Sequence, residues 1–478
     1  MSARPFDPAH VGSLDLRSAR AAFEYALAVP RDARRALARG WLALGVLALL
    51  AAGLFSLLLV LARAPYTQAL MPWPGLFRTA LVVHVDLSVL VWFIAFGGAL
   101  WSLNSSTRWL RLGWAALGLA LLGTALMAGA PFAGEAEALM SNYIPVVRQP
   151  VFLAGLVVFA AGAALLVLRA MGAIPPVGRY VTGAGALRFG LNTAAVATFL
   201  ALAAFAASYL GLPRGLNGQA YYELLFWGGG HVLQFGYTQL MLVAWLWLAS
   251  ASDLRLSASP RVTLVLFALG LAAVFTVPVI YLAFPVGSPE HIKLFTWLMA
   301  YGGSLATLPL ALVVTAAIAV GPRAGGAARP LRAALIVSVV LFGSGGALGF
   351  LIGGSNVIIP AHYHGCIVGV TLAFMGLTYH LLPRLGGAEP DRRWAARQPW
   401  IYGGGQLLHV AGLAISGGYG VQRKVAGAEQ GLESLERILG MGLMGLGGLA
   451  AVAGGALFLA LVLASVGRAL RRARAGSG

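Results

Sequence analysis

Stretches of about twenty apolar residues recur along this chain from one end to the other, and they limit its fold more than any other feature. As an α-helix, each stretch can cross the hydrocarbon core of a bilayer, which is about 30 Å thick. Only 10% of the 478 residues are charged and 59% are hydrophobic, whereas a soluble domain needs far more charge to cover its surface. The chain is therefore predicted to be an all-α integral membrane protein.

The apolar stretches predict about twelve transmembrane helices, separated by joints rich in proline and glycine. No stretch between them is long enough for a separate folded domain. We expect a basic N-terminal segment at 1–39, a twelve-helix membrane domain at 40–467 and a basic tail at 468–478. The predicted helices span residues 40–63, 78–103, 109–131, 147–171, 185–210, 220–250, 261–284, 291–320, 331–353, 358–384, 399–418 and 438–467.

Basic residues are concentrated in both termini and in every even-numbered connection, and the other connections are poorer in them. Since cytoplasmic loops carry the excess of lysine and arginine, both termini are expected to be cytoplasmic in a bacterial inner membrane. This topology accounts for the net charge of +18 without a nucleic-acid partner. The single cysteine, Cys366, excludes a disulfide within the chain and any paired-cysteine metal site.

Seven of the eight histidines, all but His10, lie in or beside apolar stretches. His84 falls on the second helix, His231 on the sixth, and His362 and His364 on the tenth. These helices are even-numbered and run inward, so the topology places all four imidazoles in the outer half of the membrane. An ionisable group in lipid is costly and usually has a partner or a function, and imidazole nitrogen is an axial ligand of haem iron. The alternative for any one of them is ordinary packing with a hydrogen bond.

The sharpest signal is the sequence His362–Tyr363–His364. Residues two apart on a helix point about 200° apart, at roughly 100° per residue. Such a pair cannot chelate one metal from one face, but it can serve two different haems on opposite sides of the helix. A purely structural pair is the alternative.

The segment around this pair resembles the tenth helix of subunit I of the haem–copper oxidase superfamily. That superfamily includes the cytochrome c oxidases and the large subunit of nitric oxide reductases. The likeness rests on Ser355–Asn356, Pro360–Gly365, Gly376 and Leu382–Pro383, and helix number and order agree over nearly the whole chain. The resemblance implies a subunit I-like helix bundle that binds two haems, one low-spin and one high-spin, expected to be of b type.

Position by position, the resemblance assigns His362 as the proximal ligand of the high-spin haem. It assigns His364 as one ligand of the low-spin haem, and His84 as the other. Arg423 and Lys424 resemble the basic pair that holds haem propionates between the last two helices, a charge-assisted contact. For this basic pair the alternative is an ordinary solvated loop.

Trp227–His231 resembles the segment that supplies the first ligand of the family's second metal, which is copper in oxidases and iron in nitric oxide reductases. Two features depart from the family pattern. Phe235 stands where oxidases often have tyrosine and nitric oxide reductases have glutamate. The family also has two adjacent histidines on its seventh helix, and the matching residues 278–284 contain no histidine. A copper site needs about three nitrogen donors, so the copper B site is incomplete and we predict less than one copper per chain. His291 is a substitute ligand that the sequence leaves open.

Five residues are candidates for a role in the chemistry. His231 would remain from the second-metal site, and Glu223, two turns before it, is a possible oxygen ligand or proton carrier. Tyr237 and Tyr281 could donate protons or electrons near the high-spin haem, as could Tyr301. The alternative for each tyrosine is packing in the core or at the interface.

The function expected from the resemblance is that of a membrane respiratory oxidoreductase, a terminal oxidase or an enzyme like nitric oxide reductase. Electrons would pass from the low-spin to the high-spin haem, which reduces a small gas molecule, oxygen or nitric oxide. The donor would be another subunit, a soluble cytochrome or a quinol, and lipid surrounds the bundle. Two alternatives stay open: a catalytically impaired electron-transfer or gas-sensing subunit without copper B, and a transporter.

Overall fold

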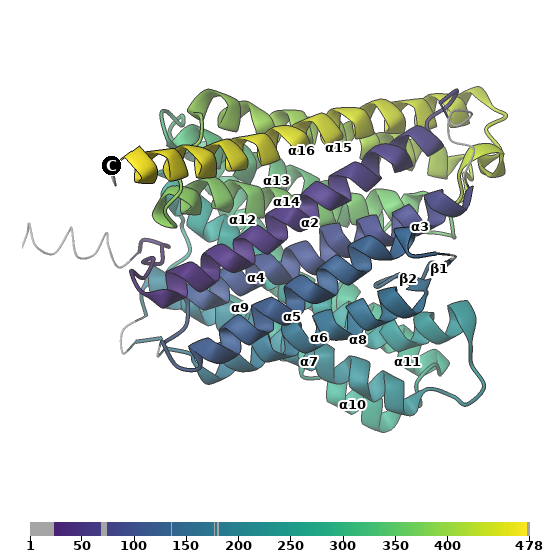
Figure 1. The fold of residues 1–478 in the computed structure, drawn as a ribbon, viewed down its shortest axis with the longest axis horizontal. Helices are drawn as coiled ribbons and strands as arrows, with labels where there is room; N and C mark the ends of the chain where they lie inside the picture. The colour runs from purple at the N-terminus through teal and green to yellow at the C-terminus, as the bar shows by residue number, and fades with distance from the viewer. Residues whose placement is uncertain (1–22, 68–73, 135, 176, 179–180, 476–478) are drawn as a thin grey trace, which may run out of the picture.

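The computed structural model describes residues 23–67, 74–134, 136–175, 177–178 and 181–475 as one bundle of long helices lying roughly side by side (Figure 1). His10 and most of the basic N-terminal segment lie outside the described residues. The helices are α2 (Ala33–Arg63), α3 (Pro74–Val85), α4 (Trp92–Leu103), α5 (Leu110–Gly129), α6 (Pro150–Gly172), α7 (Gly183–Gly211), α8 (Gly218–Ala251), α9 (Pro260–Val274), α10 (Val277–Ala283), α11 (Pro289–Trp297), α12 (Ser304–Val320), α13 (Ala328–Gly349), α14 (Ile358–Arg384), α15 (Arg392–Gly418) and α16 (Leu435–Ala475).

Short irregular elements interrupt or join these helices. Two of the described segments are π-helical, which means that their backbone hydrogen bonds join residues five apart instead of four. Both lie inside membrane-length helices. Among the described residues, two short 3₁₀ turns and one small hairpin lie in the connections. Their bounds are Asp86–Val91 and Leu298–Gly302 for the π-helical segments, Ala130–Phe132 and Gly427–Gln430 for the 3₁₀ turns, and Glu137–Leu139 (β1) and Val146–Arg148 (β2) for the hairpin.

The prediction of about twelve membrane-spanning helices is confirmed. Within the described ranges, eleven helical spans are long and apolar enough to cross a bilayer. The twelfth, α15, is long enough but carries Arg397, Gln398, Gln406 and His409 among many glycines, which lowers its apolar character. It nevertheless packs against α13, α14 and α16 as a full member of the bundle.

Helix starts differ from the prediction where an acidic side chain caps the helix. α2 begins at Ala33 rather than at residue 40, because Asp32 accepts a hydrogen bond from the backbone N–H of Arg34. α15 begins at Arg392 rather than at 399, because Asp391 accepts from the N–H of Trp394. Each cap satisfies a backbone donor that the first helical turn leaves free.

The predicted seventh helix is broken. α9 ends at Val274 and α10 begins at Val277, with Pro278 in the first turn of α10. Proline has no N–H and favours the start of a helix over its interior. Residues 278–284, which match the segment where the family has its histidine pair, therefore fall largely on a separate short helix.

The hairpin between α5 and α6 was not predicted. Glu137 pairs with Arg148 and Leu139 with Val146 in antiparallel register, and a 3.1 Å ion pair between Arg148 and Glu137 lies across its open end. Strands of three residues are too short to show the alternation that identifies a strand. The turn of this hairpin carries residues that reach the candidate site.

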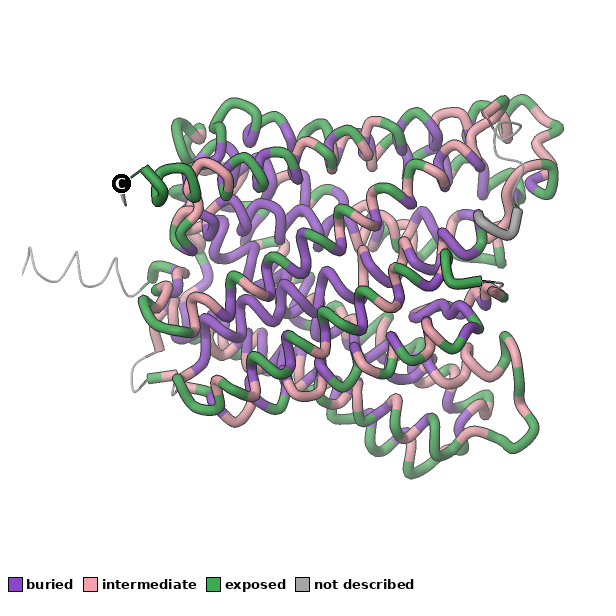
Figure 2. Tube along the Cα trace, in the orientation of Figure 1, coloured by how far each residue is buried: buried purple, intermediate pink, exposed green. Residues whose placement is uncertain are grey.

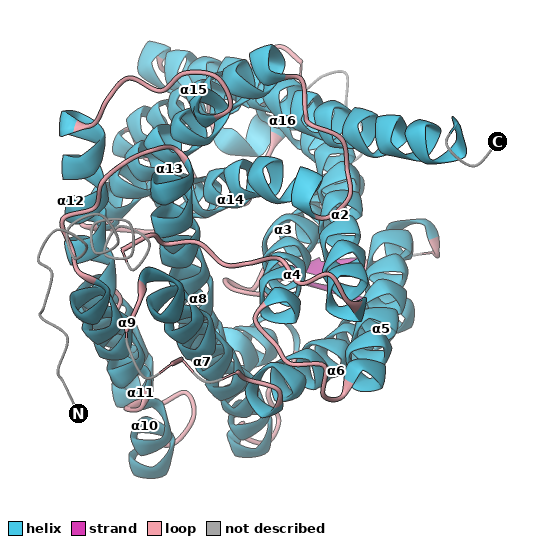
Figure 3. Ribbon diagram, turned by 90° about the vertical axis from the view of Figure 1, so that its left-hand side faces the viewer, coloured by secondary structure: helices cyan, strands magenta, loops and turns pink. Residues whose placement is uncertain are grey.

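α8 and α14 form the interior of the bundle. In an 18-residue apolar stretch of each helix, 89% of the residues are buried in α8 and 83% in α14. The corresponding share is 22% in the span formed by α11 and α12. Figure 2 shows the buried residues gathered along the middle of the bundle, with exposed residues on the peripheral helices. Viewed end-on, α14 and α8 are enclosed by the other helices (Figure 3). The candidate histidines lie on or beside these two helices.

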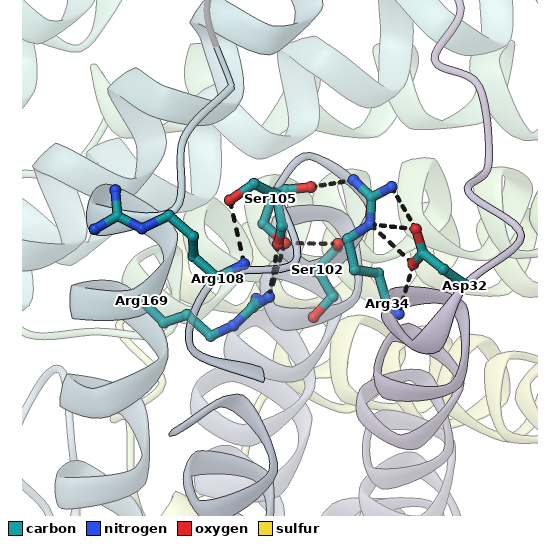
Figure 4. A network of polar contacts seen from close by, with 7 residues as sticks. Asp32, Arg34, Ser102, Ser105, Arg108 and Arg169 are labelled. Atoms are coloured by element: carbon teal, nitrogen blue, oxygen red, sulfur yellow. Dashed lines mark hydrogen bonds and ion pairs between the residues drawn. The ribbon is translucent and has the colours of Figure 1, made fainter. Parts of the chain in front are cut away.

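One end of the bundle is tied by a polar network (Figure 4). Arg169, only 1% exposed, donates to Ser105 Oγ at 3.0 Å and to the carbonyl oxygens of Ser106 and Trp109, both at 3.2 Å. Arg34 donates to the Ser105 carbonyl and pairs with Asp32 at 2.6 Å. These bonds join the start of α2 to the connection between α4 and α5 and to the end of α6.

Candidate functional site

The first turns of α14 carry His362 and His364, and their rings contact different neighbouring helices. His362 Nδ1 lies 2.7 Å from the carbonyl oxygen of Gly345 on α13. The His364 ring lies against His409 of α15, with ring centroids 4.8 Å apart. This arrangement agrees with the divergence expected for residues two apart on one helix.

Four histidines share one hydrogen-bond arrangement that fixes their protonation. In each, Nδ1 lies within bonding distance of a backbone carbonyl oxygen, which can only accept. Nδ1 therefore carries the proton, and Nε2 keeps a lone pair that can bind a metal. Metal-ligating histidines in proteins typically show such a bond from the other ring nitrogen. The bonds are His84 to Ala52 at 2.9 Å, His231 to Trp227 at 2.7 Å, His362 to Gly345 at 2.7 Å and His409 to Met444 at 3.0 Å.

Three of these helices bring histidines into one region of the bundle. His84 lies near the end of α3, next to the π-helical segment and bonded to Ala52 of α2, and the His409 ring of α15 lies 4.8 Å from the His364 ring of α14. His84, His362 and His364 are partly accessible, whereas the residues of α14 from Val368 to Tyr379 are continuously buried. The donor set and the accessible rings fit axial ligation of haem iron, which takes neutral imidazole nitrogen.

Aromatic rings surround His231 on α8. Its ring centroid lies 4.6 Å from Tyr143, 4.8 Å from Trp227 and 6.0 Å from Phe295. The glycines 228–230 before it allow this packing, since a Cβ on Gly230 would overlap the Tyr143 ring. In the described part of the chain, His231 thus has a free Nε2, and its ring neighbours are aromatic side chains rather than a second metal donor.

His291, on α11, is fully buried, and neither ring nitrogen has a hydrogen-bond partner among the described residues. Its ring contacts Tyr281 at 5.1 Å and Phe295 at 5.0 Å between centroids. Phe295 contacts both His231 and His291, and the described part of the chain holds no group of three or more His, Cys, Asp or Glu residues able to bind a metal. This donor set does not fit a copper ion with three nitrogen ligands.

The other predicted catalytic residues lie apart from one another. Tyr237 is buried against Phe93, with ring centroids 4.8 Å apart and a hydroxyl that has no hydrogen-bond partner in the described structure. The Tyr281 hydroxyl is 2.7 Å from Ser208 Oγ, beside the His231 region. Tyr301 is 68% exposed and does not face the interior.

Arg423 and Lys424 lie at the His362 end of α14. The backbone N–H of Val357 donates to Val421 at 3.0 Å, which pairs their loop with the start of α14. Arg423 donates to Asn142 Oδ1 at 2.6 Å, and Lys424 Nζ donates to the carbonyl of Met140. The turn of the hairpin is therefore held by the basic pair.

Glu223 closes the same network from α8. It accepts from the backbone N–H of Asn142 at 3.1 Å and from the Asn142 side chain. Burial and the neighbouring charge of Arg423 lower the pKa of Lys424 to about 8, and the attraction of Glu223 only partly opposes them. Glu223 thus faces the basic pair and the hairpin, not His231.

Asn142, Tyr143 and His409 are residues beside the candidate site that the sequence analysis did not single out. Asn142 and Tyr143 lie in a connection between predicted helices, where nothing in the pattern indicated that the chain folds back over α8. The ring of His409 lies against that of His364, a contact that the sequence does not indicate. An imidazole on a glycine-rich, polar helix was the one available signal for it.

Comparison with known proteins identifies the family. A family model described as cytochrome c and quinol oxidase polypeptide I matches residues 36–449. Uncharacterised proteins of Rickettsia prowazekii (strain Madrid E) and Aquifex aeolicus (strain VF5) are 28% and 31% identical. These alignments cover 88% and 73% of this chain and 94% and 85% of the two relatives, respectively.

The fold is similar to a chain from the cryo-EM structure of a heme-copper terminal oxidase dimer. The TM-score is 0.71 at 18% identity, over 91% of this chain and 84% of the other. Identity at this level supports the shared fold, and the family model, which matches most of the chain, supports common descent. The chain belongs to the cytochrome c and quinol oxidase polypeptide I family, that is, subunit I of the haem–copper oxidases.

Proposed function

We propose that this protein is a respiratory oxidoreductase that holds a low-spin haem between His84 and His364 and a high-spin haem on His362. When bound, these haems would supply electron transfer and the reduction of oxygen or nitric oxide. The single observation that carries the proposal is the shared Nδ1-to-carbonyl bond of His84 and His362, which directs a free Nε2 lone pair from each ring. We expect both haems to be of b type.

The separation of the two haems follows from the helix that carries both ligands. His362 is supported by α13 and His364 is in contact with α15, so the α14 backbone lies between the two ligands. A haem with two histidine ligands has no free coordination position and would only carry electrons. A haem with His362 alone would keep one open side for a small gas molecule.

Arg423 and Lys424 are proposed to hold haem propionates. Both cations lie at the end of α14 nearest the histidine pair, and their present acceptors are Asn142 and a backbone carbonyl. A propionate carboxylate would form stronger, charge-assisted bonds with the same groups. The bond of Arg423 to Asn142 would also couple the propionate contacts to the hairpin over His231.

The second-metal site has decayed in this proposal. His231 keeps a free Nε2, but its neighbours are Tyr143, Trp227 and Phe295 rather than nitrogen donors. The same observation favours a second function, in which the chain binds haem as an electron-transfer or gas-sensing subunit without turnover. The two functions differ in whether the reduced protein consumes oxygen or nitric oxide.

The electron donor is proposed to be another subunit, a soluble cytochrome or a quinol. The single cysteine, Cys366, lies on α14, so a paired-cysteine copper site and a Cys-x-x-Cys-His haem attachment are both excluded in this chain. We propose a bacterial inner membrane with both termini cytoplasmic, because lysine and arginine are concentrated in the termini and in the even-numbered connections of the sequence.

Turnover by the purified protein in nanodiscs tests this function. The reduced protein should consume oxygen or nitric oxide, and His362→Ala should abolish that consumption. His380→Ala is the matched control, because His380 lies on the same helix against Trp247 and away from the proposed ligands. Haem content without any consumption would select the electron-transfer or sensing function, and absence of haem would reject both.

A further inference from the structure

A cavity of about 380 Å³ that is half open to solvent lies at the end of the bundle where α2 begins and α14 ends. Its size is in the range of small-ligand sites. The extended segment before α2 forms one wall, and the first turn of α2 and the last turn of α14 form the rest. The lining residues are Leu27, Ala28, Val29, Pro30, Arg31, Arg35 and Arg384.

The charged residues that line this cavity are all positive. Three guanidinium groups line it, and none of the lining residues is acidic. Asp32, next in sequence to Arg31, is already paired with Arg34 at 2.6 Å. Three like charges around one space repel each other, and an anion between them would offset that repulsion.

Arg35 provides the second observation. Its Nε is buried and has no hydrogen-bond partner in the described structure, although buried polar atoms in proteins almost always have one. Arg384 donates one Nη1 bond to the carbonyl of His380 at 2.7 Å, which leaves the other donors of that guanidinium available. Arg384 therefore has exposed donors at the cavity, whereas the Arg35 Nε is closed off from solvent and would reach a ligand only after its side chain moves.

We propose that this cavity binds a phosphate-bearing anion, either the headgroup of an anionic lipid or a soluble phosphate compound. Guanidinium forks match phosphate oxygens in pairs. Basic pockets between helices near the cytoplasmic surface are also where anionic headgroups bind. This site is independent of the proposed haem ligands.

Two probes test the proposal on the purified full-length protein. Inorganic pyrophosphate is titrated by calorimetry, and lipid retention is measured by native mass spectrometry from nanodiscs of equal phosphatidylglycerol and phosphatidylcholine. Arg384→Gln, at an exposed side chain, and Arg35→Gln should each weaken the binding by about tenfold or more, as expected for loss of bonds to a charged group. The double variant Arg392→Gln/Arg393→Gln removes exposed charges at the start of α15 and should leave binding unchanged.

Binding of pyrophosphate supports a soluble ligand, and selective retention of phosphatidylglycerol supports a lipid headgroup. If Arg35→Gln does not assemble, Arg384→Gln alone decides, since its side chain lies at the surface. Absence of binding by both probes overturns the proposal. Equal loss in the control variant also overturns it, because the effect would then be one of general charge.

A different observation carries a second inference, which rests on the proposed function. His364 is the proposed ligand without a backbone carbonyl partner: no hydrogen bond to its ring nitrogens is found among the described residues, unlike those of His84 and His362. Its ring contacts are Tyr363, at 5.3 Å, and His409, at 4.8 Å and a tilt of 57°.

His409 is held in a fixed orientation by α16. Its Nδ1 donates to the Met444 carbonyl at 3.0 Å, so its Nε2 is an acceptor. Glycines let α15 and α16 approach closely: a Cβ on Gly447 would overlap the backbone of His409, and one on Gly412 would overlap that of Met444. His409 itself is only 9% exposed.

We infer that His409 is a positioning residue for His364. If Nε2 of His364 binds iron, its Nδ1 carries a proton and needs an acceptor, and His409 Nε2 is the acceptor that the fold brings to that ring. His409 would thus take the place of the carbonyl that supports the other ligands. Such a partner raises the basicity of the ligand and orients its ring.

The test compares His409→Phe, which removes the acceptor, with His409→Gln, which supplies an amide oxygen near the Nε2 position. Loss of the acceptor makes His364 a weaker electron donor, so the midpoint potential of the low-spin haem should rise and its electron paramagnetic resonance signal should shift. His409→Gln should lie between His409→Phe and the wild type. His380→Phe is the control and should match the wild type.

If His409→Phe does not assemble, His409→Gln must still differ from the wild type in signal and potential. A low-spin haem that is present and unchanged in both variants overturns this inference alone. A wild-type protein without a low-spin haem overturns the proposed function as well, so the two failures are distinguishable.

Discussion

Tyr143 lies against His231 with ring centroids 4.6 Å apart, and this contact fixes the hairpin turn on α8. The contact exists because residue 230 is glycine, since a Cβ there would overlap the Tyr143 ring. The aromatic cover over His231 is therefore built into the backbone of α8.

Gly230→Ala should displace Tyr143 and destabilise the protein by about 1–3 kcal/mol, the usual cost of overpacking a tight core. The midpoint of thermal unfolding in nanodiscs measures the change. Gly404→Ala is the control, because a Cβ at that helical position meets no atom within 4 Å. It should be neutral or should stabilise by up to about 1 kcal/mol through helix propensity. Equal effects at the two positions would contradict the packing argument.

Arg169→Met should destabilise the end of the bundle shown in Figure 4. The substitution removes the donor to the carbonyls of Ser106 and Trp109, and an unsatisfied buried group costs about 1–3 kcal/mol. Arg472→Met removes an exposed arginine near the C-terminus and should change the unfolding midpoint little. A wild-type midpoint in Arg169→Met would show that the network contributes nothing.

Lys424 predicts a pH dependence of stability. Its pKa of about 8 in the folded protein lies below the ordinary 10.5, so the unfolded chain binds the proton more tightly between these values. The folding free energy should therefore become more favourable as the pH rises from about 8 to 10.5. Lys424→Met should lack this gain, and Lys293→Met, at an exposed position, should retain it.

A bound propionate would reduce the effect at Lys424. A nearby carboxylate favours the protonated amine and raises its pKa, which reduces the gain. Unfolding midpoints of haem-depleted and haem-loaded protein across this pH range measure the difference. Identical pH profiles in the two preparations would place the propionates away from Lys424.

Metal analysis of the purified protein should give less than one copper per chain. His231 contacts aromatic rings, and Phe295 contacts both His231 and the unpartnered His291. One or two imidazoles provide too few donors for copper. Stoichiometric copper that is lost in His231→Ala would contradict this prediction and would require the rings around His231 to rearrange.

The sequence predicted those parts of the fold that depend on apolar runs. The tenth helix was predicted at 358–384 and observed as Ile358–Arg384, because the apolar run there is continuous and is followed by a Gly-Gly turn. The break before Val277 and the hairpin at 137–148 were missed. The break leaves the apolar run of its span uninterrupted, and the hairpin lies in a polar connection where short strands give no pattern.

The sequence predicts site geometry that depends on a single helix. It does not predict contacts that depend on how two elements pack against each other. The divergence of His362 and His364 follows from helix geometry alone. The contact of His409 with His364 depends on how α14, α15 and α16 pack, and the cover of Tyr143 over His231 depends on a chain reversal. Single-sequence patterns do not contain such long-range relations.

The central claim, that α14 carries ligands for two haems, is tested most directly by optical spectra of the reduced protein with and without carbon monoxide. The wild type should show two haems per chain, of which one binds carbon monoxide. His362→Ala should lose the carbon monoxide-binding haem, and His364→Ala should lose the low-spin spectrum. A protein without haem, or one that keeps both signals in both variants, would contradict the account.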